Sequence, residues 1–117
     1  VPVIKLVKGI NSQFPDHQQL KGYHIESLAI EIFKSYPESS PTTTKEMLKY
    51  FFEKGRDLIK TPIRDKTGQS INVDEYLGLE NSKDRLGLSN TLDIYYRRMN
   101  NADTIGDISQ WKNILGI

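Results

Sequence analysis

Apolar side chains recur along the chain at the three- and four-residue spacing of amphipathic α-helices. Between Pro2 and Ile10 they fall on one helical face, and Pro2 suits the first turn of a helix. A second apolar stripe runs from Gly22 to Tyr36, where Pro37 ends it because a residue before proline disfavours helical backbone angles. Its apolar members are Ile25, Leu28, Ala29, Ile32, Phe33 and Tyr36. Both segments are predicted to be helices.

Three further helices are predicted in the rest of the chain. Thr43 and Glu46 have the spacing of a capping box, so a third helix should start there and continue to about Lys60. A fourth fits roughly residues 82–102, with an apolar face made of Leu88, Leu92, Tyr95, Met99 and Ala102. A short last helix should begin with the capping residue Asp107 and continue to Leu115, ending at Gly116.

Extended segments are short. Only residues 62–63 and 71–73 resemble strands, and neither is long enough to organise a sheet. We therefore expect an all-α fold: residues 1–117 as a single helical domain of four or five helices, with one long loop at about residues 61–81. Loops of that length are usually functional or disordered. Side chains such as Asp65, Asn72 and Tyr76 can pack this one down, so we expect it to be ordered.

Composition narrows the class of protein. The 117 residues suit one domain, and the absence of cysteine excludes disulfides, thiolate metal sites and a cysteine nucleophile. The formal charge of +1 disfavours nucleic acid as a partner, which usually requires a large basic excess. No apolar run has a membrane-spanning length, and no signal-peptide pattern is present, so we expect a cytoplasmic protein without membrane contact. The start at Val1, without Met, suggests a piece of a longer protein.

The common catalytic constellations are missing from the sequence. No two acidic residues stand two positions apart, so the Asp-x-Asp pair that holds two metal ions is absent. There is also no glycine-rich phosphate loop and no Gly-x-Ser-x-Gly elbow. His17 and His24 could bind a metal only by converging with a carboxylate such as Asp16, which nothing in the sequence requires. We therefore assign no catalytic residue and no metal ligand to this chain.

Three features could nevertheless contact a ligand. Lys5 and Lys8 could direct positive charge at a phosphate, although a solvated helix face is the commoner explanation. Gly22 would leave backbone N–H groups open at the start of a helix, which favours an anion there. Tyr23 beside it could stack on a base or simply close the core. The polar loop from Pro62 to Val73 is a third candidate, or a structural turn.

The order of these motifs resembles the C-terminal helical domain of template-independent nucleotidyltransferases of the DNA polymerase β superfamily. The resemblance rests on Ile4-Lys5-Leu6-Val7-Lys8-Gly9-Ile10-Asn11, on Leu20-Lys21-Gly22-Tyr23-His24-Ile25-Glu26-Ser27-Leu28-Ala29, and on Pro62-Ile63-Arg64-Asp65 with Asn72-Val73. The branch that it resembles contains the bacterial cyclic-dinucleotide and oligonucleotide synthetases, which are relatives of oligoadenylate synthetase and cyclic GMP–AMP synthase. The resemblance covers Val1 to about Leu77, and from Asn81 onward the sequence is only a generic helical continuation.

The resemblance implies a role for three residues. Lys8 matches the lysine that contacts the triphosphate of the bound nucleotide, and Tyr23 matches the tyrosine that stacks on a base. Gly22 stands where many members have a serine that binds phosphate, so the backbone would make that contact here. Ile10 replaces a frequent tryptophan, and Asp65 lacks the proline that usually follows it.

The same resemblance implies that the catalytic machinery lies in an N-terminal domain of the same protein, preceding Val1. That domain would hold magnesium, whereas this chain would need no cofactor of its own. The expected ligand is a nucleoside triphosphate, used to make cyclic or linear oligonucleotide second messengers, as in antiviral defence. Two alternatives stay open: a helical protein-interaction module without nucleotide chemistry, and an accessory domain of an RNA 3′-end tailing enzyme, with Arg97-Arg98 as a basic stripe.

Overall fold

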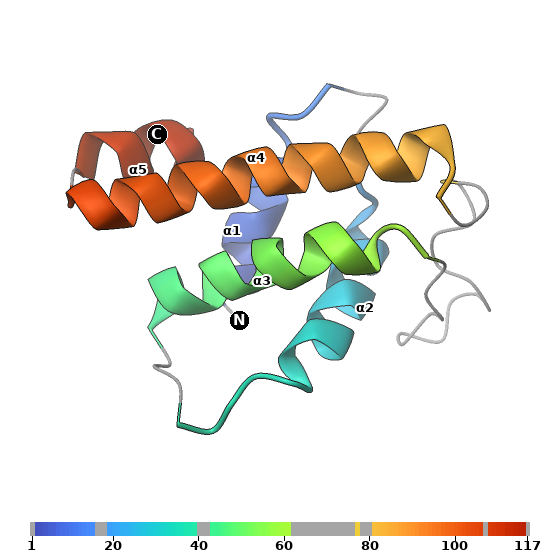
Figure 1. Cartoon of the computed structure of the whole chain (residues 1–117), viewed down its shortest axis with the longest axis horizontal. Coiled ribbons are helices and arrows are strands. Elements are labelled where there is room, and N and C mark those ends of the chain that lie inside the picture. The colour runs from blue at the N-terminus through green and yellow to red at the C-terminus, as the bar shows by residue number, and fades with distance from the viewer. Residues whose placement is uncertain are drawn as a thin grey trace.

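Five helices make up the described part of the chain in the computed structural model (Figure 1). The structure describes residues 2–15, 19–39, 43–61, 77, 81–106 and 108–116. The helices are α1 (Pro2–Asn11), α2 (Gly22–Phe33), α3 (Thr44–Leu58), α4 (Lys83–Ile105) and α5 (Ile108–Leu115). These residues contain no strand, which confirms the predicted all-α fold. Most of the predicted loop, residues 62–76 and 78–80, lies outside the described residues, so its expected order stays a prediction.

The longest helix, α4, packs most extensively against α3, and the two run side by side in Figure 1. On one side of this pair, α1 contacts α2, α3 and α5, so it links the two ends of the molecule. At the C-terminal end of α4 the chain turns back, and α5 packs against α4. None of the described helices combines the length and the apolar character needed to cross a membrane.

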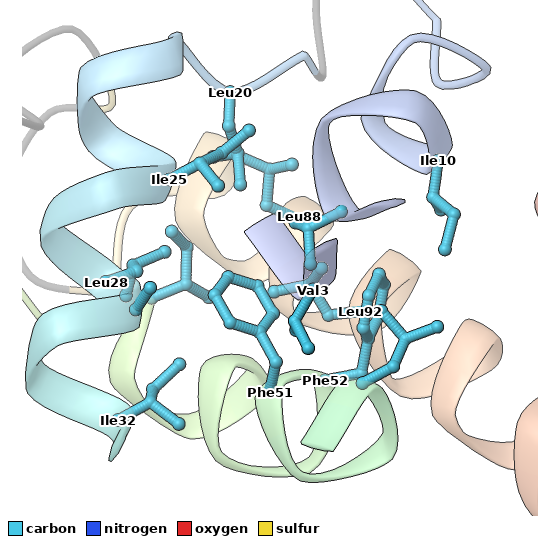
Figure 2. Close-up of a cluster of buried hydrophobic side chains, with 14 of the residues drawn as sticks. Val3, Ile10, Leu20, Ile25, Leu28, Ile32, Phe51, Phe52, Leu88 and Leu92 are labelled. Atoms are coloured by element: carbon cyan, nitrogen blue, oxygen red, sulfur yellow. The ribbon is translucent and has the colours of Figure 1, made fainter. Parts of the chain in front are cut away.

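Every helix contributes to one apolar core, whose centre is shown in Figure 2. The spacing of the buried positions is helical, which is why the sequence pattern predicts them. The buried residues are Val3, Val7 and Ile10 of α1; Ile25, Leu28, Ala29 and Ile32 of α2; Leu48, Phe51 and Phe52 of α3; Leu88, Leu92, Met99 and Ala102 of α4; and Ile114 of α5. Tyr95, predicted on the same face of α4, is only partly buried against this core.

The ends of α2 and α4 each differ from the sequence prediction by three residues, and α3 ends at Leu58 rather than at about Lys60. α2 ends at Phe33 rather than at Tyr36, because the Ser35 hydroxyl donates to the Ile32 carbonyl (3.0 Å) and Pro37 follows. The Tyr36 ring instead packs edge-on against the Tyr50 ring of α3, with centroids 4.8 Å apart. α4 continues to Ile105, three residues past the predicted end, because Gly106 is the residue that adopts the left-handed cap conformation (φ 75°).

The helices α3 and α4 each begin with a hydrogen bond to the side chain of the N-cap residue. The Thr43 hydroxyl accepts from the Glu46 backbone N–H (3.4 Å) at the start of α3, as the capping-box spacing predicts. At the start of α4 the Ser82 hydroxyl accepts from the Arg85 N–H (3.3 Å). Each cap satisfies one backbone donor that a helix start otherwise leaves without an intrahelical partner.

A buried arginine ties the start of α4 to the end of α3. Arg85 has no exposed surface, and its guanidinium donates to the carbonyl oxygens of Ile59 (3.1 Å) and Thr61 (3.3 Å). These carbonyls lie at the C-cap of α3 and in the turn that follows it, next to a helix end that leaves acceptors unpaired. The guanidinium therefore closes the C-terminal end of α3 and holds it against α4.

We predict that Arg85→Met lowers the free energy of unfolding by about 2–3 kcal/mol, because the buried Ile59 carbonyl and the partly buried Thr61 carbonyl lose a charged donor while the volume is roughly kept. Urea unfolding followed by circular dichroism measures the change. Arg97→Met is the matched control: the Arg97 side chain on the same helix is 76% exposed and its ion pair with Asp93 is screened by water, so its midpoint should fall much less than that of Arg85→Met. Equal midpoints for both variants would contradict the role of Arg85.

Partly buried ion pairs add to the α3–α4 contact. Arg56 of α3 lies 2.7 Å from Asp93 of α4, and Lys49 of α3 lies 2.9 Å from Asp103 of α4. Hydrogen bonds from Lys45 and then Lys49 lower the pKa of Asp103 below its ordinary value. The pKa of Asp93 is also lowered, first by the hydrogen bond from Arg97, while burial opposes the shift and Arg56 adds to it.

A lowered pKa in the folded state makes stability depend on pH in one direction. Above the ordinary pKa of 3.8 both carboxylates are ionised, and their contribution to the free energy of unfolding is fully present. This contribution is lost as the pH falls through the lower pKa values that the two groups have in the folded chain. We therefore predict that the urea midpoint falls as the pH drops from about 5 to about 3. In Asp103→Asn this fall should be shallower, and an unchanged slope would count against the Asp103 contribution.

Candidate anion site at the start of α2

The side chain of Asn11 fixes the position of α2 relative to α1. Its amide nitrogen Nδ2 donates to the carbonyl of Leu20 (2.9 Å), and its oxygen Oδ1 accepts from the N–H of the same residue (2.8 Å). Both residues are buried. The side-chain amide Nε2 of Gln19 adds a second hydrogen bond, to the carbonyl of Phe14 (3.1 Å). The segment that enters α2 is therefore held against the last turn of α1.

This arrangement brings Lys8 of α1 to the first turn of α2. The Lys8 ammonium nitrogen Nζ donates to Oε1 of Glu26 (3.0 Å), and both side chains are 44% exposed. A Cβ placed on Gly22 would lie 3.9 Å from both Nζ and Cε of Lys8. The end of the lysine side chain therefore lies beside Gly22, within ordinary contact distance of the place that a Cβ would occupy. Because Gly22 has no side chain, the ammonium and the backbone at the helix start remain accessible together.

The start of α2 differs from those of α3 and α4 in its capping. Lys21 occupies the N-cap position with extended backbone angles, and its side chain makes no capping hydrogen bond. The first turn of α2 also contains no acidic residue. The N–H groups of His24 and Ile25 already bond the Lys21 carbonyl, at 3.0 and 3.1 Å. The positive end of the helix dipole and the earlier N–H groups point out of the helix at this place.

Two sources of positive potential thus coincide at one exposed position. A lysine ammonium has three N–H groups, so Lys8 can keep Glu26 on one of them and bind an anion with another. The helix start favours the same sign of ligand charge. Glu26 acts in the opposite sense, because its carboxylate partly neutralises Lys8. The site therefore suits a multiply charged anion such as a phosphate chain, which can compete with a single carboxylate.

Of the three residues predicted to bind nucleotide, the structure brings Lys8 and Gly22 together. Tyr23 is the second residue of α2, but its side chain lies outside what the structure describes, so its stacking role stays a prediction. Glu26 was not predicted as a site residue, although its place one helical turn after Gly22 puts both on one face. Asn11 was missed as well, because no local pattern indicates that a residue will bond a backbone nine positions away.

Of the two histidines, only His24 belongs to the part of the chain that the structure describes. His24 is fully buried in α2, whereas Asp16 and His17 lie outside the described residues. Within the ranges that the structure describes, no three histidine or acidic side chains are grouped as metal ligands would be. The polar loop from Pro62 to Val73, including Asp65, also falls outside the described residues.

Comparison with models of known protein families, with curated proteins and with solved structures finds no match to this chain.

We predict that Asn11→Ala costs about 2 kcal/mol of unfolding free energy, since the buried N–H and C=O of Leu20 both lose their partner. Chemical denaturation gives the value. Asn113→Ala removes the same side chain from an exposed position of α5 and should leave stability nearly unchanged. If the two variants unfold at the same denaturant concentration, Asn11 does not have the structural role described here.

Proposed function

We propose that this chain is the nucleotide-positioning domain of a nucleotidyltransferase that makes cyclic or linear oligonucleotide second messengers from nucleoside triphosphates. The observation that carries the proposal is the position of the Lys8 ammonium over Gly22 at the start of α2, a helix end that no side chain of its N-cap residue closes. The resemblance of the sequence motifs assigns the phosphate contact to these same two residues. Geometry and motif order therefore support the same site independently.

The charge of the site suits a triphosphate better than a nucleic acid. The whole chain has a formal charge of only +1, so it lacks the broad basic excess that binds a polyanion. A single lysine at a helix start is enough to orient one phosphate chain, since the compact ammonium acts as a point charge. Lys8 would hold a phosphate oxygen while backbone N–H groups of the first turn of α2 hold another. Tyr23 would stack on the base.

The role of this chain in the reaction would be positional. The described residues contain no group of acids that could hold metal ions, so the magnesium implied by the resemblance would be held by an N-terminal domain of the same protein. When bound there, magnesium would activate the attacking hydroxyl and stabilise the leaving pyrophosphate. Lys8 and the start of α2 would fix the nucleotide across the cleft, which contributes through proximity and electrostatic stabilisation.

A helical protein-interaction module is the second candidate. Ile105 and Ile108, on either side of the turn between α4 and α5, are 59% and 72% exposed, and exposed apolar side chains of this kind are common in contact surfaces. This alternative does not require Lys8 to bind anything. An NMR titration of the chain with a nucleotide therefore separates the two functions, because only the first predicts signal shifts at the start of α2.

We predict that ATP shifts the amide NMR signals at the start of α2, and that Lys8→Ala weakens this binding about fivefold, since the ammonium is half exposed and its contact is screened by water. Glu26→Gln should strengthen binding, because it removes the carboxylate that competes for Lys8. The same titration, followed by two-dimensional NMR, measures all three affinities.

Lys34→Ala is the matched control for this experiment. Lys34 follows the opposite end of α2, where it makes a comparable exposed ion pair with Glu31 (3.4 Å), so its loss removes the same charge and one surface contact. ATP affinity should not change in this variant beyond the small effect of net charge. Equal weakening by Lys8→Ala and Lys34→Ala, or ATP-induced shifts confined to the α4–α5 turn, would contradict the assignment.

A further inference from the structure

A second site lies at the other end of the molecule, where α1, α3, α4 and α5 meet. These helices line an open pocket of about 450 Å³, which is within the size range of small-molecule sites in proteins. Its wall is mainly apolar and includes Leu6, Leu48, Trp111 and Leu115. Trp111 and Leu115 pack against the core but keep part of their surface exposed. The helices thus leave an accessible apolar hollow rather than a filled interface.

This pocket is separate from the Lys8 site. Leu6 lines the pocket, and Lys8 contacts the start of α2. Residues two positions apart on an α-helix point about 200° apart around its axis, so the two side chains leave opposite faces of α1. A ligand in the pocket would therefore not occupy the nucleotide site.

One edge of the pocket carries charge. Lys45 and Asp103 both line it, and their Nζ and Oδ1 atoms are 2.7 Å apart. Lys49 also binds this carboxylate, through Oδ2 at 2.9 Å. The two lysines lower the pKa of Asp103, so its carboxylate is ionised at neutral pH. Among the described residues at this edge, two ammonium groups share one carboxylate, an excess of one positive charge.

The helix that carries Lys45 adds to this potential. Thr44 and Lys45 are the first two residues of α3 and both line the pocket, so the positive end of the helix dipole lies at the same edge. Glu46, the acidic residue of that turn, is not among the residues that form the pocket. The Lys45 side chain is 49% exposed and can reach a ligand without leaving Asp103, because an ammonium has several donors.

We propose that this pocket binds a small amphipathic carboxylate, with an aliphatic or aryl body among the apolar side chains and its carboxylate against Lys45. The apolar wall specifies the body of the ligand, and the net positive edge specifies the charge of its head. This site goes beyond the proposed function, because it uses none of the residues that contact the nucleotide.

The chain contains a single tryptophan, and that residue lines the pocket, so its fluorescence reports directly on the site. The 117-residue chain is titrated with decanoate, with decanol and with decyltrimethylammonium, which have linear alkyl chains of nearly equal length and differ in the charge of the head. We expect a saturable change in Trp111 emission, with decanoate binding at least about threefold tighter than decanol and the cation binding weakest. High salt should reduce this preference.

Two substitutions should change the decanoate affinity in opposite directions. Lys45→Met keeps an apolar stem but removes the charge, and it should weaken decanoate binding to about the level of decanol. Asp103→Asn leaves both lysines without a counter-charge and should strengthen it. Lys112→Met, an exposed lysine next to Trp111 that does not line the pocket, is the matched control and should bind decanoate like the unsubstituted chain. Circular dichroism verifies that each variant is folded.

Three results would overturn the proposal. Equal affinities for the three alkyl probes would show that the charged edge does not select the ligand. Equal effects of Lys45→Met and Lys112→Met would show the same. A change in Trp111 emission that does not saturate with probe concentration, in a folded chain, would show that no site exists. The ATP titration is independent of all three, since Lys45→Met leaves Lys8 and Gly22 intact, so failure here and failure of the nucleotide site can be told apart.

Discussion

The paired hydrogen bonds between the Asn11 side chain and the backbone of Leu20 determine where α2 begins relative to α1. An asparagine amide offers a donor and an acceptor in the same geometry as a peptide group, so it can satisfy both polar groups of a buried residue at once. Without this contact the buried Leu20 backbone would have to find other partners. This pairing, together with the Gln19 contact to Phe14, holds the segment between the two helices against α1 and so helps to bring Lys8 to Gly22.

α1 consequently serves two regions of the molecule. One of its faces brings Lys8 to the start of α2, and another supplies Leu6 to the pocket beside α5. The α3–α4 pair is the stable support for both, since it buries Phe51, Phe52, Leu88 and Leu92 and is closed at one end by Arg85. The Lys8 site at the start of α2 and the apolar pocket beside α5 can therefore both form in one small domain, because the same core supports them.

The sequence predicts the helices well because their apolar residues follow the helical period and their ends carry proline, glycine or capping residues. The apolar face of α4 and the Thr43 cap are examples. It does not predict Arg85 as a buried residue, since a charged side chain at a helix start normally indicates solvent. The contact of Lys8 with Gly22 is suggested by the order of motifs, but its distance depends on Asn11, whose partner no periodicity reveals. The sequence also does not predict the pocket, because it forms only where four helices pack against one another.

The most direct test of the Lys8 site is a crystal structure of the chain with a non-hydrolysable nucleoside triphosphate analogue. We predict a phosphate oxygen within hydrogen-bond distance of Lys8 Nζ and of a backbone N–H in the first turn of α2, with the Asn11–Leu20 pairing unchanged. Phosphates bound elsewhere on the surface, with Lys8 still bonded only to Glu26, would contradict the account.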